Sequence, residues 1–235
     1  MGQTESRRFI YGRRQGHRLH PRQARLVDDV LPTLRLDLAQ AKTLDKCFDR
    51  PRQSYALEIG FGGGEHLAAR AQANPDTGYI GCEPFINGVA KLLLSISEDG
   101  IDNIRIHDDD ARDVLDALPD GGLDTVYLLY PDPWHKLRHN KRRFISQQNV
   151  QEIFRVLRPG GQFLVASDIA DYLAWTLSHL KRHGGFSWTA NHANDWLQAP
   201  PAWPGTRYEA KAIAAGRQPG YLQFERRATP EAGYL

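Results

Sequence analysis

The sequence alternates short runs of β-prone residues with segments in which apolar residues have helical spacing. The clearest strand, 123–130, is apolar for most of its length, as is typical of a strand buried on both faces. The clearest helix has Val150, Ile153, Phe154 and Leu157 at i, i+3, i+4 and i+7 and ends at 158–161. Repeated strand–helix units predict an α/β fold with helices on both faces of a mostly parallel sheet. Strands are predicted at 55–59, 79–82, 103–107, 123–130, 162–167 and 221–226, and further helices at 65–74, 87–97, 111–118 and 172–183.

Size and composition indicate one globular unit. With 235 residues, of which 41% are hydrophobic, the chain can bury one sizeable core, so we expect a basic, flexible arm over residues 1–25 and a single domain over 26–235. No apolar run approaches the roughly 20 residues of a membrane span, and the N-terminus has no signal-peptide core. These features predict a cytoplasmic protein that does not bind membranes. Cys47 and Cys82 are too few for a disulfide framework, and the histidines lack metal-ligand spacing, so no metal is predicted.

Positive charge is concentrated in two segments. Residues 1–25 carry a net charge of +6 and residues 134–144 carry +5, although the whole chain carries only +2 and the remainder is therefore at −9. An acidic body with two basic patches is typical of proteins that bind a phosphate backbone. Taken alone, either patch also fits a solvated face or a disordered tail.

A glycine-rich turn follows the first predicted strand, with glycines at 60, 62 and 64. Glycine allows sharp turns and a close approach of the backbone to a ligand. A dinucleotide-binding fingerprint would need its third glycine at position 65, where this chain has Glu65, which disfavours a nicotinamide cofactor. The observed spacing, with Glu58 two residues before the first glycine, is the kind found in S-adenosylmethionine-dependent methyltransferases.

Acidic residues follow the next two predicted strands. Glu83 lies where a carboxylate can accept both hydroxyls of a ribose, and Asp110 lies where one can accept the amino group of adenine. Alternatively, 108–110 is a helix cap with solvated acids. A hard-cation site is a weaker alternative, because three adjacent acids cannot all converge on one ion. Acids after successive strands, together with the glycine turn, favour one adenosine-containing ligand.

The segment after the fourth strand combines Pro131-Asp132-Pro133-Trp134 with a run of cations. The prolines stiffen the loop and remove hydrogen-bond donors. Asp132 can then accept from the N–H groups of a guanine edge, and Trp134 offers a stacking face for a base. The alternative is a proline-rich turn with a surface tryptophan.

Taken together, segments 57–64, 131–143, 167–168 and 206–209 resemble the bacterial tRNA (guanine-N7)-methyltransferase family. The resemblance runs from about residue 50 to the C-terminus. It implies the class I methyltransferase fold, a Rossmann-like seven-stranded sheet that is mostly parallel with an antiparallel last strand. It also implies methyl transfer from S-adenosylmethionine, which leaves S-adenosylhomocysteine, to N7 of the guanine at position 46 in the tRNA variable loop. The implied partner is tRNA, with no obligatory protein partner.

The same resemblance assigns roles to individual residues. Asp132 is the implied catalytic residue, and the cofactor-binding residues are Glu58, Gly60, Gly62, Glu83, Asp110 and Asp132. The implied substrate-binding residues are Lys136, Asp168, Thr206, Arg207, Tyr208 and Glu209. The implied RNA-contacting residues are Trp134, Arg138, His139, Asn140, Lys141, Arg142 and Arg143. Without the resemblance, Asp168 fits a helix N-cap and 206–209 an ordinary loop.

Three other function classes explain less of the sequence. A methyltransferase acting on small molecules or proteins has no need for two strongly basic patches. A nucleic-acid-binding module without catalysis does not account for the ordered acids. A nicotinamide enzyme conflicts with Glu65.

Overall fold

Seven strands form a single sheet in the order β3-β2-β1-β4-β5-β7-β6 in the computed structural model, which describes residues 11–230. Strands β1 to β5 pair in parallel, whereas β7 is antiparallel to both β5 and β6. The predicted mostly parallel sheet with an antiparallel last strand is therefore confirmed. The strands are β1 (Ser54–Ile59), β2 (Thr77–Cys82), β3 (Ile104–His107), β4 (Leu123–Leu129), β5 (Leu157–Ser167), β6 (Phe186–Trp188) and β7 (Gly220–Arg226).

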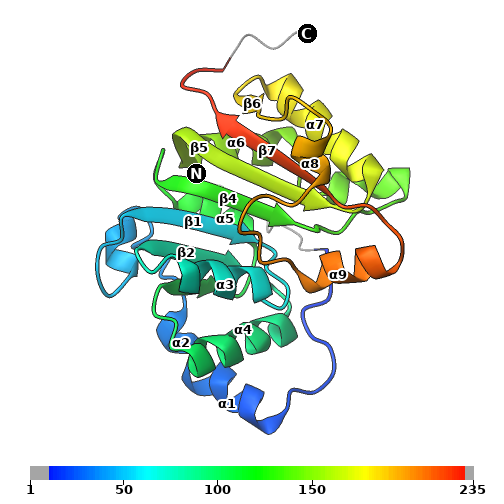
Figure 1. Cartoon of the computed structure of the whole chain (residues 1–235). Helices are drawn as coiled ribbons and strands as arrows, with labels where there is room; N and C mark the ends of the chain where they lie inside the picture. Colours follow the sequence, from blue (N-terminus) through cyan, green and yellow to red (C-terminus); the bar gives the residue numbers. More distant parts are fainter. Residues whose placement is uncertain (1–10, 231–235) are drawn as a thin grey trace, which may run out of the picture.

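Helices cover both faces of the sheet (Figure 1). One face packs against α1 (Pro21–Asp29), α2 (Leu31–Leu34), α3 (Glu65–Ala73) and α4 (Ile86–Asp99). The other packs against α5 (Ala111–Ala117), α6 (Gln147–Val156) and α7 (Ala170–His183). Short helices complete the described part of the chain: η1 (Leu44–Cys47), η2 (Leu137–Arg142), α8 (Asn194–Leu197) and α9 (Arg207–Ala214).

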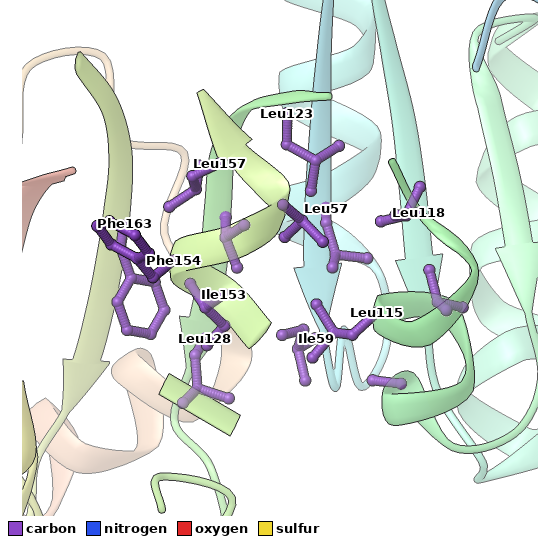
Figure 2. Close-up of a cluster of buried hydrophobic side chains, with 14 of the residues drawn as sticks. Leu57, Ile59, Leu115, Leu118, Leu123, Leu128, Ile153, Phe154, Leu157 and Phe163 are labelled. Atoms are coloured by element: carbon purple, nitrogen blue, oxygen red, sulfur yellow. The ribbon is translucent and has the colours of Figure 1, made fainter. Parts of the chain in front are cut away.

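Alternating side chains of the central strands divide between two apolar cores. On β4, Val126 and Leu128 belong to the α5–α7 core, whereas Tyr127 and Leu129 belong to the core beneath α3 and α4. This is the alternation expected of a strand that is buried on both faces. Figure 2 shows the first core, where Leu115 from α5 faces the strand residues. The two cores fix the carboxyl ends of the strands as one rigid edge.

The sequence did not predict several short elements. Strand β6 has three residues, and α8 has four, too short to show a period. Helix α9 lies in the segment 189–219, where proline and glycine obscured its pattern. The predicted turn at 158–161 belongs to the first part of β5, where the register with β4 shifts.

Part of the basic arm is ordered against the body. Residues 11–20 run beside the start of α4, where the Ile86 N–H donates to the Arg14 carbonyl at 3.0 Å. The Asn87 side chain accepts from Gly16 N–H and donates to the His17 carbonyl, both at 2.7 Å. We call residues 11–17 the strap. Residues 1–10 of the arm, including Arg7 and Arg8, lie outside the described residues, whereas residues 21–25 belong to α1.

None of the helices within residues 11–230 is long and apolar enough to cross a membrane. The same part of the chain contains no cluster of three or more His, Cys, Asp or Glu side chains suited to a metal ion. Cys47 and Cys82 are both free thiols.

Candidate active site

A cavity of about 720 Å³ opens at the carboxyl ends of the central strands. Its walls come from the segments that follow β1, β2, β3 and β4 and from residues 11–13 of the strap. Open α/β sheets bind ligands at this edge, and small-molecule sites have volumes of roughly 300–1,000 Å³. We call this the central cavity.

The glycine turn after β1 forms one wall of the central cavity. Gly60, Gly62 and Gly64 have φ angles of 71°, 60° and 80°, a region that other residues rarely adopt. Nothing lies within 4 Å of the position that a Cβ on Gly60 would occupy, whereas a Cβ on Gly62 would lie 2.9 Å from the Tyr208 ring. The turn therefore leaves space for a ligand at Gly60 and contacts α9 at Gly62.

Glu83 is anchored beside this turn. Its carboxylate accepts from the backbone N–H of Gly62 at 2.7 Å and of Phe85 at 2.9 Å. Burial raises the pKa of Glu83, against the two N–H donors that lower it, and the nearby Asp132 raises it further. Each carboxylate oxygen has a second lone pair, so Glu83 can still accept hydrogen bonds from hydroxyl groups in the cavity.

Asp110 follows β3 and has two structural roles. It is the N-cap of α5, because its side chain accepts from the Arg112 N–H at 3.0 Å, and it pairs with the Arg112 guanidinium. The predicted helix cap is thus present. Asp110 also lines the central cavity, so the cap fixes an acceptor at the cavity wall.

Glu58 has a different position from the other predicted cofactor-binding acids. It is buried, its carboxylate lies 2.7 Å from Nδ1 of His66, and it is not among the residues that line the central cavity. His66 also packs against the rings of Tyr127 and Trp203. In this structure the Glu58–His66 contact joins β1 to α3, the elements on either side of the glycine turn.

The loop after β4 brings Asp132 to the cavity in a stiff frame. Tyr130 and Trp134, on either side of the two prolines, have φ angles of 50° and 44°, which is uncommon for residues with a side chain and typical of functional loops. The Asp132 carboxylate lines the cavity and makes no hydrogen bond to any other residue within 11–230. Although Asp132 is exposed by surface area, the protein around it displaces enough water to raise its pKa.

The cations after Trp134 form the basic run, residues 136–143. Lys136, Arg138 and Lys141 are exposed, whereas His139 and Asn140 are half-buried. The Arg142 guanidinium lies over the rings of Tyr11 and Trp134, at 4.7 and 4.9 Å from their centroids. Desolvation and the neighbouring cations lower the pKa of His139. The positive charge of the run therefore comes from its lysines and arginines.

Arg143 corrects one part of the predicted RNA-contacting segment. Its side chain is fully buried, Nε donates to the Pro133 carbonyl at 2.9 Å, and the guanidinium pairs with Asp171. It also lies over the rings of Tyr172 and Trp175 at 5.5 and 5.0 Å. A guanidinium enclosed in this way cannot reach a phosphate, so Arg143 holds the Asp132 loop on α7 instead of contacting RNA.

We expect Arg143→Ala to destabilise the protein by about 2–4 kcal/mol, because it removes two hydrogen bonds from a charged group and two stacking contacts. For a domain of this size, each kcal/mol lowers the melting temperature by roughly 2–4 °C. Calorimetry checks the shift. Arg142→Ala is the matched control, because Arg142 is the adjacent arginine and its own side chain is only half-buried. Equal losses in the two variants would contradict this role for Arg143.

Asp168 is paired, but not as a helix cap. Its carboxylate accepts from Nε of Arg217 at 2.5 Å, and α7 begins at Ala170 with Ile169 as its N-cap residue. The alternative of a capping role is therefore wrong. The pair connects the end of β5 to the segment after α9, near the same edge of the sheet.

Segment 206–209 begins a helix, and its four side chains have different environments. Thr206 caps α9 by accepting from the Glu209 N–H at 3.0 Å. Glu209 is buried, accepts from Nε1 of Trp203 at 2.6 Å and also bonds to the Tyr221 hydroxyl. Only Tyr208, which is exposed, lines the central cavity, with the Arg207 guanidinium over its ring. Thr206 and Glu209 thus position α9, and Tyr208 faces the ligand space.

Two residues that shape the candidate site have no sequence signal, one in the cavity wall and one behind the glycine turn. Tyr11 is an isolated aromatic residue in an arm that we interpreted only by its charge, yet it lines the cavity and stacks with Arg142. Gly88 lies in the first turn of α4, and a Cβ there would be 2.0 Å from the Gly62 carbonyl oxygen. Only the packing of α4 against the glycine turn reveals the need for glycine at this position.

Residues 52–220 match the model of a protein family described as "Putative methyltransferase". A tRNA (guanine-N(7)-)-methyltransferase from Agrobacterium fabrum is 51% identical over 231 residues, which cover 95% of this chain and 100% of the relative. A protein of the same name from Brucella melitensis is 50% identical over 220 residues, covering 93% of this chain and 94% of the relative. Among solved structures, a 16S rRNA methyltransferase superposes with a TM-score of 0.58 at 16% identity, over 82% of this chain and 94% of that one, which shows a shared fold.

Proposed function

The chain belongs to the tRNA (guanine-N7)-methyltransferase family, and on this premise we propose that it transfers a methyl group from S-adenosylmethionine to N7 of a guanine in tRNA. The proposed target is position 46 in the variable loop, and the proposed site of action is the cytoplasm, where tRNA is used. One observation carries the proposal: the Asp132 carboxylate lies in a cavity between anchored acids and the exposed cations of the basic run.

The cavity residues fit S-adenosylmethionine. The open space at Gly60 admits close approach of a ligand, Glu83 can accept from ribose hydroxyls, and Asp110 can accept from the adenine amino group. When bound, the cofactor supplies a methyl group activated by the attached sulfonium. Glu58, behind the turn, would act by holding the turn in shape. We propose that no metal takes part.

The chemistry requires positioning more than proton transfer. Guanine N7 carries a free lone pair, so no general base is needed to expose it, and the purine gains positive charge as the methyl group arrives. A carboxylate beside the base stabilises that charge. Asp132 is suited to this role because the stiff proline loop fixes it and the raised pKa reflects limited solvation. Trp134 and Tyr208 offer aromatic faces at the same cavity.

Incubation with methyl-labelled S-adenosylmethionine and unfractionated tRNA, followed by digestion to nucleosides, tests the function. We expect the label in N7-methylguanosine, at position 46 of the variable loop. Label in another nucleoside, or in protein, would contradict the assignment. The same reaction with purified protein alone tests whether this chain acts without a protein partner.

The raised pKa of Glu83 predicts a pH dependence of cofactor binding. Ribose hydroxyls donate to the ionised carboxylate, so affinity should be full above the raised pKa and fall as the pH drops through it, at a higher pH than for an ordinary glutamate. The folding stability of the ligand-free protein should change with pH in the opposite direction. Protonation removes the buried charge of Glu83, so its contribution to stability rises as the pH falls through its raised pKa.

Calorimetric titration of cofactor binding over a pH series checks this prediction, with Glu83→Gln as the reference. The variant should bind more weakly and lose the Glu83-dependent part of the profile. Asp132 also has a raised pKa and affects Glu83, so an Asp132→Asn series separates its contribution. Identical profiles for wild type and Glu83→Gln would contradict the role of Glu83.

A further inference from the structure

A second hollow, of about 740 Å³, adjoins the central cavity. One wall is the strap, one is the start of α4, and the third is Arg207 at the start of α9. Arg13 and Phe85 line both hollows, so the two are direct neighbours. We call the second one the α4 groove.

The charged side chains of the α4 groove are all potential cations. Arg13, His17, Lys91 and Arg207 line it, and no carboxylate does. Arg13 and Lys91 are exposed, with no ion pair to another described residue. Arg207 has a long ion pair, with 3.9 Å between its Nε and a carboxylate oxygen of Glu65. This buried Nε has no hydrogen-bond partner among the described residues. Glu65 compensates Arg207 only weakly, and the other cations of the groove have no paired carboxylate within residues 11–230, so a net positive charge favours an anionic ligand.

Hydrogen bonds and close packing hold the strap wall of the α4 groove against α4. The Asn87 side chain holds the strap by two hydrogen bonds of 2.7 Å, to Gly16 and His17. A Cβ on Gly16 would lie 2.8 Å from the Phe85 ring, so the strap packs closely on the wall. The cations on the strap therefore have fixed backbone positions relative to Lys91.

The α4 groove and the basic run follow strands on opposite sides of β1. The basic run follows β4, whereas the groove begins after β2, and β1 with its glycine turn lies between these strands. The strap connects the two regions, because Tyr11 at one end stacks with Arg142 and residues 16–17 are held by Asn87. Cations thus line two sides of the cavity mouth.

We propose that the α4 groove binds the sugar–phosphate backbone of the substrate tRNA on the side of the target nucleotide opposite the basic run. An RNA strand that inserts one base into a cavity continues in both directions, and each direction needs phosphate contacts. Lys91 and Arg13 provide them here, as exposed charges on opposite walls whose backbone positions are fixed. This inference rests on the proposed function, since it takes tRNA as the ligand.

The test is the salt dependence of tRNA binding to the full chain, for wild type, Lys91→Ala and the double variant Lys91→Ala/Arg13→Ala. Each lost phosphate contact should flatten the slope of log K against log salt by about 0.7–0.9. Lys46→Ala is the matched control: Lys46 is also exposed but belongs to η1, near the Asp45 that bonds to Tyr55 at the start of β1. We expect the control to keep the wild-type slope. Melting curves confirm that each variant is folded.

Slopes for the groove variants that equal those of wild type, or a loss no larger than that of Lys46→Ala, would overturn the proposal. Failure of the proposed function is a separate outcome, because it would show as absence of N7-methylguanosine with the wild-type protein. The binding experiment uses no methyl transfer, so the two results are independent.

Discussion

Asp132→Asn is expected to lower the single-turnover rate of methyl transfer to tRNA by about 10²–10³-fold, the scale seen when one preorganised electrostatic group is removed from an active site. The variant keeps the size of the side chain and its carbonyl oxygen but loses the negative charge. Because the Asp132 carboxylate makes no hydrogen bond within the described part of the chain, the fold should be unaffected. Rapid-quench measurement with saturating cofactor and tRNA checks the rate.

Two comparisons make this result specific. Asp99→Asn removes a carboxylate from the last residue of α4, away from the cavity, and should leave the rate unchanged. Cofactor affinity measured by calorimetry should change much less than the rate, because Asp132 is proposed to act on the charge that develops during transfer. A rate for Asp132→Asn within about twofold of wild type would exclude the electrostatic role.

The sequence predicted the site where the signal was a property of the backbone. Glu83 and Asp110 follow buried strands, and parallel strands must end at one edge, so their meeting at the cavity could be inferred without coordinates. Gly60 and Gly62 predict a turn because glycine readily adopts conformations that other residues avoid, and both have positive φ in the structure. In these cases local chemistry and topology together determine the position.

The sequence could not predict which way neighbouring side chains point. Arg142 and Arg143 are adjacent and chemically identical, yet one stacks at the cavity mouth and the other is fully buried against α7. Tyr208 and Glu209 differ in the same way, one facing the cavity and the other bonded to Trp203 and Tyr221. Neighbouring residues point to different faces, and only tertiary packing decides which face is covered. A charge pattern therefore overstates the number of cations that can bind RNA.

Gly88→Ala is expected to destabilise the protein and weaken cofactor binding, although Gly→Ala within a helix ordinarily stabilises by about 0.4–1 kcal/mol. The φ of Gly88 is not in the left-handed region, so alanine is conformationally acceptable there. The new methyl group would nevertheless lie 2.0 Å from the Gly62 carbonyl oxygen, which is backbone and cannot rotate away. Overpacking of this kind costs about 1–3 kcal/mol, and occasionally more.

The displaced atom belongs to the glycine turn, and the Gly62 N–H holds Glu83, so relief of the clash must move two elements of the proposed cofactor site. A penalty of about 1.4 kcal/mol on binding alone corresponds to a tenfold rise in Kd, and we expect at least this much by calorimetry. Ser97→Ala, on the exposed face of the same helix, should instead be neutral or slightly stabilising, as helix propensity predicts. If Gly88→Ala raised the melting temperature as well, α4 would not pack against the turn as closely as described, and the preorganisation of Glu83 would need another cause.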